Sequence, residues 1–515
     1  MTTQLAERLG RTSSREPANT SEGRKVLRDS LVVTLGGQLE RALGTLTALA
    51  LRWGLDPAHL GVYTGLRLFL DNTNRTSLGI GLGAVQEIPI LRAAGRDAEA
   101  RHLTNVAYTT NTLTCLVYAS GLAVWAWLRF PAVASDPLAA EWTWGLVAIS
   151  GLALIKRYES FLIAILRAHR EFALTAELDV VESLVSAAAV SLGLWFAGFW
   201  GLLGAVAVIL LVKIAYAHAR HPLRFVWAWD GVEIWRLFRI GMPILANTAV
   251  FGALLNIDRV IILGRLNDGE RAAGLYTIAI MGTSWSLDLA GRIVLVLYTA
   301  FQTTLGHTCD PLKVAEQAAR ATEAQAPALL AGSAVAYLIA PAFLGLLMPR
   351  YLEGLPALRP LLPGMILLAM AWPARQMLIA IGRPYVLCLA TLLGLGITAI
   401  AAALGGDRAG IVGVAWGMSL GYACAFGLTS AAAFVPLIGL TRWLEHQWRL
   451  SRTIMGFSLA TLLVSHFPLG QSNRWQELAE RSVLLASWLI PTLLLWARRY
   501  GFGMTKGPLT PIQKR

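Results

Sequence analysis

Long uninterrupted apolar blocks dominate this chain of 515 residues. The block 106–128 contains no charged residue, and 361–381 contains only Arg375. Further uncharged blocks, some of them shorter, lie at 143–155, 184–199, 202–212, 329–348, 385–404 and 411–438. A helix needs roughly 20 apolar residues to cross the hydrocarbon of a bilayer, which is about 30 Å thick. The pattern therefore predicts an all-α polytopic membrane protein.

The blocks and the polar segments between them predict about fourteen transmembrane helices. We place them near 29–52, 60–84, 104–128, 142–166, 175–198, 201–219, 239–264, 272–301, 325–348, 358–381, 385–404, 411–436, 452–468 and 480–498. The segment 454–467 is short, so it either spans the membrane or lies in the interface.

Three short sequences recur in the same order along the chain. Leu60-Gly61-Val62-Tyr63 matches 273–276, 162–167 matches 378–383, and 201–205 matches 410–414, at offsets of 213, 216 and 209 residues. Because each repeat unit holds six helices, its copies share one orientation in the membrane. We therefore predict two lobes related by a pseudo-two-fold axis along the membrane normal.

This repeat predicts the division of the chain. We expect the N-terminal lobe at 29–219, an interfacial linker at 220–238, the C-terminal lobe at 239–436 and a helix pair at 437–498. The segments 1–28 and 499–515 are expected to be cytoplasmic tails, and 1–28 lacks the apolar core of a cleaved signal. Aromatic residues among arginines suit a linker helix lying in the interface, as an anchor or as a hinge.

The net charge of +13 follows the predicted topology. Only 15% of the residues are charged and 56% are apolar, which excludes a soluble nucleic-acid-binding protein. Arginine and lysine concentrate in alternate loops, as the positive-inside rule requires. The segments rich in arginine and lysine are the N-terminal tail, 92–101, 156–170, 220–239, 313–320, 442–452 and the C-terminal tail. Both termini are therefore predicted to be cytoplasmic.

Charged residues inside the predicted spans are concentrated in the first two helices of each lobe. Arg67, Asp71 and Arg75 have i, i+4, i+8 spacing, which places them on one face of the helix predicted at 60–84. Asp288 and Arg292 repeat the i, i+4 spacing. The other charged residues inside these predicted helices are Glu40, Arg41, Asp258 and Arg259.

A charge at the bilayer centre costs roughly 2.5–3.5 kcal/mol even on the lenient insertion scale. The clustering therefore favours a polar cavity between the lobes. Salt bridges that hold helices together, and side chains that reach the interface, are the alternative explanation.

Patterns of catalysis are missing from the sequence. It contains no Gly-rich phosphate loop, no HExxH and no G-x-S-x-G, and its four cysteines and its histidines lack metal-ligand spacing. The loop around Asp56 is too short for the acidic pair of a membrane glycosyltransferase. We expect a transporter without a cofactor or metal.

Several segments resemble the polysaccharide-exporter branch of the MOP superfamily, which is related to lipid II flippases and MATE multidrug exporters. They are 55–63 with 78–85, 256–264 leading into 274–276, 380–384 and 410–417. The resemblance spans roughly 29–436. It implies a two-lobed flippase that moves a polyprenyl-diphosphate-linked oligosaccharide across a bacterial inner membrane by alternating access.

The resemblance also implies roles for the charged residues. Cationic side chains in the cavity hold the diphosphate in such proteins, and by position these are Arg41, Arg75 and Arg292, with Arg67 and Arg259 as further candidates. Glu40, Asp71, Asp258 and Asp288 are cavity carboxylates or coupling candidates. The alternative is a cation-coupled MATE-like exporter. Expected partners are the lipid-linked oligosaccharide, membrane lipids, and a polymerase or glycosyltransferases, but not nucleic acid.

The topology is testable by cysteine labelling in intact cells. A cysteine in the 130–140 loop should react with a membrane-impermeant reagent added from outside, because this loop is predicted to be extracytoplasmic. A cysteine in 86–102 should not react. Labelling of 86–102 from outside would contradict the predicted orientation.

Overall fold

The computed structural model describes residues 43–134, 136–169, 171–466 and 474–500, and these are helical with short connections. No strand occurs in the described residues, so the prediction of an all-α chain is confirmed there. The first half contains residues 43–54 of helix one, α3 (Pro57–Asn72), η1 (Thr73–Ser77), α4 (Ile80–Ala93), α5 (Asp97–Arg129), η2 (Phe130–Ala134), α6 (Pro137–Ala168) and α7 (Phe172–Arg220).

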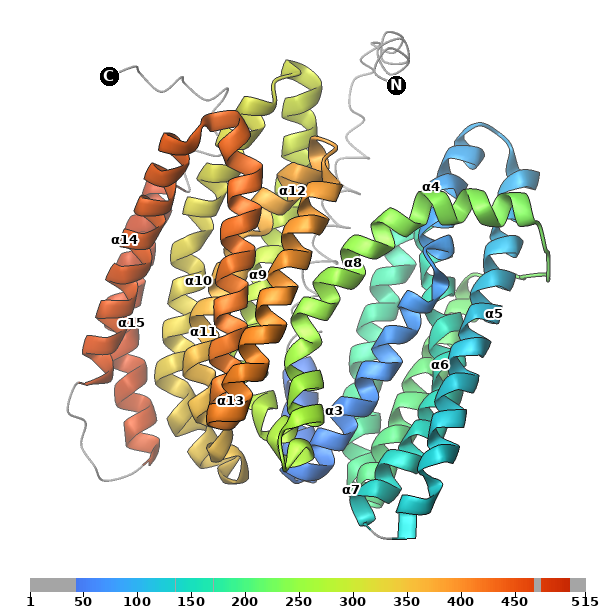
Figure 1. The fold of residues 1–515 in the computed structure, drawn as a ribbon, viewed down its shortest axis with the longest axis horizontal. Helices are drawn as coiled ribbons and strands as arrows, with labels where there is room; N and C mark the ends of the chain where they lie inside the picture. The colour runs from blue at the N-terminus through green and yellow to red at the C-terminus, as the bar shows by residue number, and fades with distance from the viewer. Residues whose placement is uncertain (1–42, 135, 170, 467–473, 501–515) are drawn as a thin grey trace.

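The second half begins with α8 (Gly231–Arg265), which crosses from one group of helices to the other (Figure 1). It continues with α9 (Gly269–Thr308), α10 (Pro311–Leu347), η3 (Pro349–Gly354), α11 (Leu355–Met370), α12 (Trp372–Ala380), α13 (Pro384–Ile438), α14 (Leu440–Ser465) and α15 (Arg474–Tyr500). Helices α14 and α15 both pack on α10. Seven described segments are long and apolar enough to cross a membrane.

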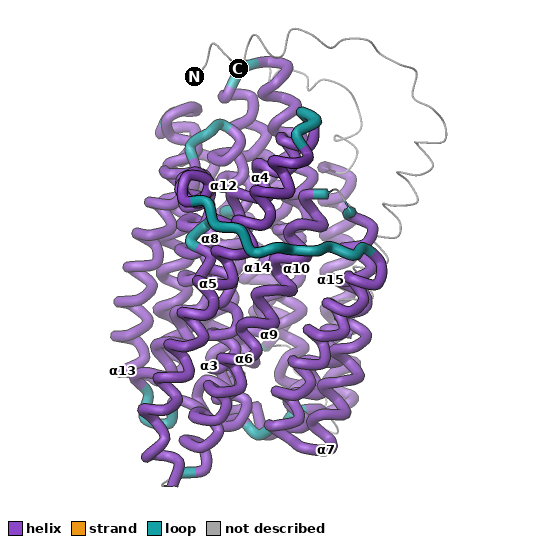
Figure 2. Tube along the Cα trace, turned by 90° about the vertical axis from the view of Figure 1, so that its right-hand side faces the viewer, coloured by secondary structure: helices purple, strands orange, loops and turns teal. Residues whose placement is uncertain are grey.

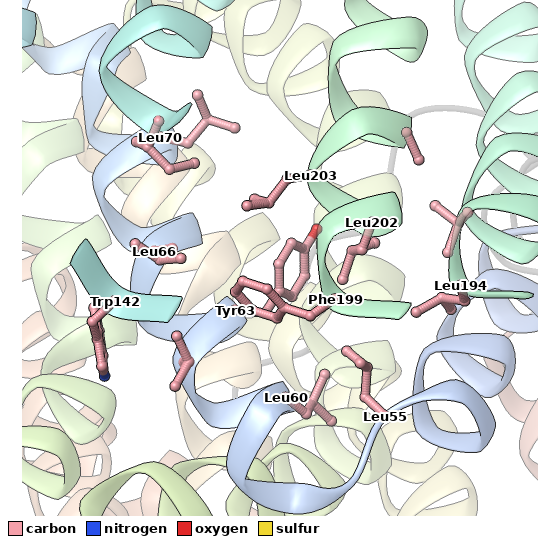
Figure 3. Close-up of a cluster of buried hydrophobic side chains, with 14 of the residues drawn as sticks. Leu55, Leu60, Tyr63, Leu66, Leu70, Trp142, Leu194, Phe199, Leu202 and Leu203 are labelled. Carbon is pink, nitrogen blue, oxygen red and sulfur yellow. The ribbon is translucent and has the colours of Figure 1, made fainter. Parts of the chain in front are cut away.

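Among the described residues, one apolar cluster is shared by the two halves at one end of the molecule. This cluster joins Leu60, Tyr63 and Leu66 of α3 to Leu275 of α9 and Tyr351 of η3. Figure 3 shows the part of this cluster that α3, α6 and α7 contribute. At the opposite end, the cluster around α4, α5 and α6 is separate from the cluster around α10, α12 and α13. The halves are therefore joined at the end that carries the loops 55–56 and 266–268, which we call the joined end.

Two glycines allow the halves to meet at the joined end. A Cβ on Gly61 would lie 1.7 Å from the carbonyl oxygen of Glu270, and a Cβ on Gly274 would lie 1.7 Å from that of Pro57. Gly61 thus packs on Glu270, four residues before Gly274, and Gly274 packs on Pro57, four residues before Gly61. A reciprocal contact of this kind is what a two-fold axis between the halves produces. The superposition of whole lobes stays a prediction.

The structure corrects the spacing of the sequence repeat. Ala168 and Ala380 end α6 and α12, and their positions differ by 212. Gly198 and Gly410, the kinks inside α7 and α13, also differ by 212. The offset of 213 at Gly61 agrees within one residue, whereas the offsets of 216 and 209 were wrong by a few residues. Short apolar sequences match at several neighbouring positions, so helix ends define the offset better.

Helices α7 and α13 each contain two predicted spans packed against one another at the same glycine contact. A Cβ on Gly201 would lie 1.9 Å from the carbonyl oxygen of Gly193, and a Cβ on Gly413 would lie 1.8 Å from that of Gly405. Glycine is needed at both places because the two backbones touch. The hairpins of the two halves therefore share one packing solution.

The helix predicted at 60–84 is broken. Its regular part ends at Asn72, Leu78 and Gly79 have left-handed φ values of 50° and 80°, and α4 begins at Ile80. Gly79 faces α8 so closely that a Cβ would lie 2.5 Å from the backbone of Gly241. The polar run 72–77 and Gly79 inside 60–84 favour a break, and the approach of α8 requires glycine at this position.

The linker between the halves is also different from the prediction. Residues 221–230 are extended and not helical, and Figure 2 shows them as a teal stretch that crosses the helices beside α8. The amides of Val226 and Ala228 donate to Asn105 Oδ1 at 3.1 Å and Thr109 Oγ1 at 2.9 Å. Side chains of α5 thus satisfy the backbone of the linker, which removes the need for a helix.

The paired glycine contacts predict matched effects of substitution. Gly201→Val and Gly413→Val should each lower the free energy of unfolding by about 1–3 kcal/mol, because the added side chain overlaps backbone of the paired helix. SDS-induced unfolding of the purified protein measures this. Gly204→Val is the control, since a Cβ at Gly204 would meet nothing within 4 Å. Equal stability of Gly201→Val and Gly204→Val would contradict the packing.

Candidate functional site

Arg67 and Asp71 lie on an exposed face of α3. Arg67 Nε lies 3.7 Å from Asp71 Oδ2, and the two side chains are 58% and 59% exposed. Helices α6 and α9 pack on other parts of α3. At 1.5 Å per residue, Arg67 is about 15 Å from the start of α3. Because 60–84 is predicted to span the membrane, these exposed charges are expected to face water, since contact of a charge with lipid is costly.

Arg75 lies in the 3₁₀ turn η1, at the break after α3. Its Nη1 donates to Asn72 Oδ1. Its Nη2 rests against α8, where a Cβ on Gly252 would lie 1.9 Å from that nitrogen. The predicted common face therefore holds for Arg67 and Asp71 but not for Arg75, because the helix ends before Arg75. Asp71 pairs with Arg67, and the expected contact between Asp71 and Arg75 is not formed.

Asp258 and Arg259 lie on the part of α8 that packs against the second half. Asp258 is 3% exposed and accepts the backbone amide of Arg259 at 2.7 Å. Its neighbours Ile261 and Ile262 belong to the core of the second half. Arg259 Nη1 donates to Asn256 Oδ1. Asp258 is therefore buried inside the second half, which corrects its assignment as a carboxylate of the cavity between the lobes.

Asp288 and Arg292 are exposed on α9. No ion pair joins them in the part of the chain that the structure describes, so the expected tether of Arg292 by Asp288 is not formed there. Arg41 and Glu40 lie outside the described residues.

The cationic residues form a staggered series along the inner helices, not one cluster. At 1.5 Å per residue, Arg259 lies about 9 Å from the joined end of α8 and Arg67 about 15 Å from that of α3. Arg75 follows, and Arg292 lies about 35 Å along α9. The structure therefore spreads these side chains along the helices and does not bring them together at one point.

Polar contacts reinforce the joined end. Arg52, which is 9% exposed, donates from Nη2 to the carbonyl oxygen of Thr277 at 3.1 Å. Tyr351 donates its hydroxyl to the carbonyl of Leu55 at 2.9 Å. The indole of Trp142 donates to Glu270 Oε1 at 3.0 Å, beside the Gly61 contact. This layer closes the space between the halves at one end.

One further pocket, of about 640 Å³, opens beside the joined end of the second half. Four of its five charged side chains are already paired, Arg265 with Asp407 at 3.1 Å and Arg271 with Glu353 at 2.8 Å, and the fifth is Asp268. No group of three or more possible metal ligands occurs in the described ranges. This pocket is therefore a weak candidate for a substrate site.

Known proteins with similar chains are membrane transporters. The profile of a family described as "Polysaccharide biosynthesis protein" matches residues 89–323. The lipid II flippase MurJ, in an inward closed conformation, is similar with a TM-score of 0.65 and 11% identity, over 91% of this chain and 99% of that one. A comparison with curated sequences finds no match.

Two further solved structures extend the similarity. An inward-facing multidrug MATE transporter aligns with a TM-score of 0.58 and 16% identity, over 80% of this chain and 94% of that one. A MOP superfamily transporter from Pyrococcus furiosus aligns with a TM-score of 0.54 and 15% identity, over 83% of this chain and 96% of that one. The chain has the fold of the MOP superfamily. The resemblance predicted from the sequence is thereby confirmed, and identities this low extend it to the fold alone.

This chain also contains buried charged side chains that were not predicted from its sequence. Arg52, Arg157 and Arg375 are 9%, 7% and 6% exposed. Glu159 and Lys213, 2% and 4% exposed, form an ion pair inside the first half. Arg157 and Arg375 had been assigned to the positive-inside set because of their sequence neighbours. Their distance from the helix ends, eleven residues for Arg157 and five for Arg375, was the available signal.

Substitution of Gly61 tests whether the glycine contact holds the two halves together at the joined end. In a protein whose four native cysteines are replaced, a cysteine at Thr277, which is 8% exposed, should react slowly with a membrane-impermeant maleimide. Gly61→Leu should speed this reaction about tenfold or more, because its side chain overlaps Glu270 and favours separation of the halves.

Gly264→Leu is the control on the same side, since a Cβ there would meet nothing within 4 Å. Equally slow labelling of a folded Gly61→Leu protein would show that the glycine contact does not hold the halves together.

Proposed function

We propose that this chain is a flippase that moves a polyprenyl-diphosphate-linked oligosaccharide from the cytoplasmic to the outer leaflet of a bacterial inner membrane. The MOP fold and the match to a polysaccharide biosynthesis family support a transporter or flippase. The observation that carries the substrate class is the series of exposed cationic side chains on the inner helices. Arg67 and Arg292 are exposed and Arg75 is half-buried within the spanning segments.

The chemistry of these side chains suits a diphosphate. A guanidinium binds phosphate oxygens in pairs and keeps its charge at cellular pH. Asp71 offsets the charge of Arg67, whereas Arg75 bonds a neutral amide and Arg292 forms no ion pair in the described part of the chain. The net charge along this path is therefore positive, which favours an anionic headgroup over a cationic drug.

The shape of the molecule supports alternating access. The halves share a core at the joined end and have separate cores at the other. The arginine-rich loops 92–96 and 220–224 lie at the open end, which is the cytoplasmic end under the positive-inside rule. This arrangement is then open to the cytoplasm, where the substrate is made. The polyprenyl tail stays in lipid while the headgroup occupies the space between the halves.

The membrane potential supplies a driving force for such a substrate. Because the cell interior is negative, moving a negative charge outward releases about 2.3 kcal/mol per charge per 100 mV of membrane potential. A diphosphate carries about two such charges, so the potential alone favours outward transport. A polymerase and glycosyltransferases are the expected partners of this activity.

A cation-coupled exporter is the second candidate, because Asp258 is a carboxylate buried in a spanning helix. Buried carboxylates in such positions are typical of proton or sodium coupling. The same residue is compatible with a coupled flippase, so the substrate decides between the two functions.

The decisive experiment replaces the unneutralised arginines. Arg75→Ala and Arg292→Ala should each lower flipping of a fluorescent polyprenyl-diphosphate oligosaccharide in vesicles by about tenfold or more, because a charged hydrogen bond to the substrate is lost. Lysine at either position should restore transport in part, since the charge returns without the paired geometry.

Arg383→Ala is the matched control, because Arg383 is exposed in a short loop at a helix end. Membrane abundance of each variant should equal that of the unaltered protein. Normal flipping by the Arg75→Ala/Arg292→Ala double variant would end the diphosphate hypothesis. Loss of drug efflux in an Asp258→Asn variant that still flips lipid would favour the exporter.

A further inference from the structure

The break in the second helix leaves a helix N-terminus in the middle of the first half. Helix α4 begins at Ile80 after Gly79, and no side chain caps its first turn. Ile80 is 2% exposed, so this turn is buried. The first backbone N–H groups of a helix have no partner within the helix. At membrane depth such donors need a protein or ligand acceptor.

Two buried side chains from neighbouring helices converge on this N-terminus. A Cβ on Gly81, in the first turn of α4, would lie 3.1 Å from Asn111 Nδ2 and 3.8 Å from Arg157 Nη2. Asn111 is 2% exposed and Arg157 is 7% exposed. Arg157 donates from Nη2 to Asn111 Oδ1 and from Nη1 to the carbonyl of Asn74 at 3.3 Å. These contacts fix the orientation of the Asn111 amide.

The free groups at this point are all donors. Among the described residues, neither Asn111 Nδ2 nor Arg157 Nε has a hydrogen-bond partner. No carboxylate of the described chain forms an ion pair with Arg157, and Glu159 on the same helix is bonded to Lys156 at 3.0 Å and to Lys213. A buried cation without a counter-charge is costly in a membrane protein. Backbone amides, an amide nitrogen and a guanidinium together match an anion.

Another buried arginine, in the second half, is satisfied differently. Arg375 lies over the ring of Phe251 at 4.1 Å and of Trp372 at 5.6 Å, and it donates to Thr391 at 3.2 Å. Its cation is therefore stabilised by aromatic faces. Arg157 has no such aromatic contact in the structure's described residues.

We propose that the α4 N-terminus, Asn111 and Arg157 bind a small inorganic monovalent anion, which in the cell is chloride. The Asn111 and Arg157 side chains are 2% and 7% exposed, which suits a small ion and not a diphosphate that carries a sugar and a polyprenyl chain. The anion neutralises Arg157, whose guanidinium holds the carbonyl of Asn74 next to Arg75. It thereby stabilises the turn that presents Arg75 to the space between the halves.

Thermal unfolding of the purified full-length protein tests the site. The melting midpoint should rise by about 2–4 °C on replacing gluconate with chloride at constant ionic strength, and the rise should saturate with concentration. Bromide should act like chloride, and crystals grown in bromide should give an anomalous peak within hydrogen-bond distance of Asn111 Nδ2. Equal midpoints in gluconate and chloride would overturn the proposal.

Substitutions at and away from the proposed site test where the stabilising chloride binds. Asn111→Asp places a carboxylate beside Arg157, so this protein should be as stable in gluconate as the unaltered protein is in chloride, without further gain from chloride. Arg375→Met is the matched control, because it removes a buried arginine elsewhere and should keep the full chloride dependence. An undiminished chloride effect in Asn111→Asp would place any anion elsewhere. None of these measurements depends on transport, so they stand apart from the flippase proposal.

Discussion

The contact of Gly61 and Gly274 with carbonyls of the opposite half is the constraint on which the arrangement of the chain depends. Only residues without a side chain let α3 and α9 approach this closely near their starts. Because the helices touch at one end, the polar contacts of Arg52 and Tyr351 form there. Away from that end the cores are separate, and the charged face of α3 stays uncovered.

The cost of charge in a membrane explains how the remaining residues are used. Exposed charges such as Arg67 and Asp71 face a space that water can enter. Buried charges need another solution, and three are present. Glu159 and Lys213 neutralise each other, Arg375 lies against aromatic rings, and Arg157 gathers neutral oxygens beside a helix N-terminus. The first two solutions stabilise structure, whereas the third leaves room for a ligand of opposite charge.

Helix α8 connects these two aspects of the molecule. Its N-terminal part packs on α4 through Gly241, and its C-terminal part packs on α13. Between these parts, Phe251 contacts Arg375 of the second half while Gly252 accommodates Arg75 of the first. Adjacent residues of one helix thus contact an arginine from each half. Movement of the halves must change at least one of these contacts.

Sequence reasoning was accurate where the signal is a local property summed over many residues. Apolar block length predicted the all-α membrane class, which the described residues confirm. It was inaccurate at single positions. The repeat offsets of 216 and 209 differ from the 212 that separates Gly198 from Gly410. The face shared by Arg67, Asp71 and Arg75 ends at Asn72, because the helix breaks between Asn72 and Gly79.

The sequence by itself determined the class of protein and the presence of charges that hydrocarbon does not tolerate. These follow from transfer free energies, which depend on composition along the chain. Only the tertiary structure decided which charges are exposed and which are paired. Asp258 and Asp71 look alike in sequence, yet one is buried in a core and the other is 59% exposed. That difference depends on which helices pack together, because burial is a property of contacts between segments far apart in the chain.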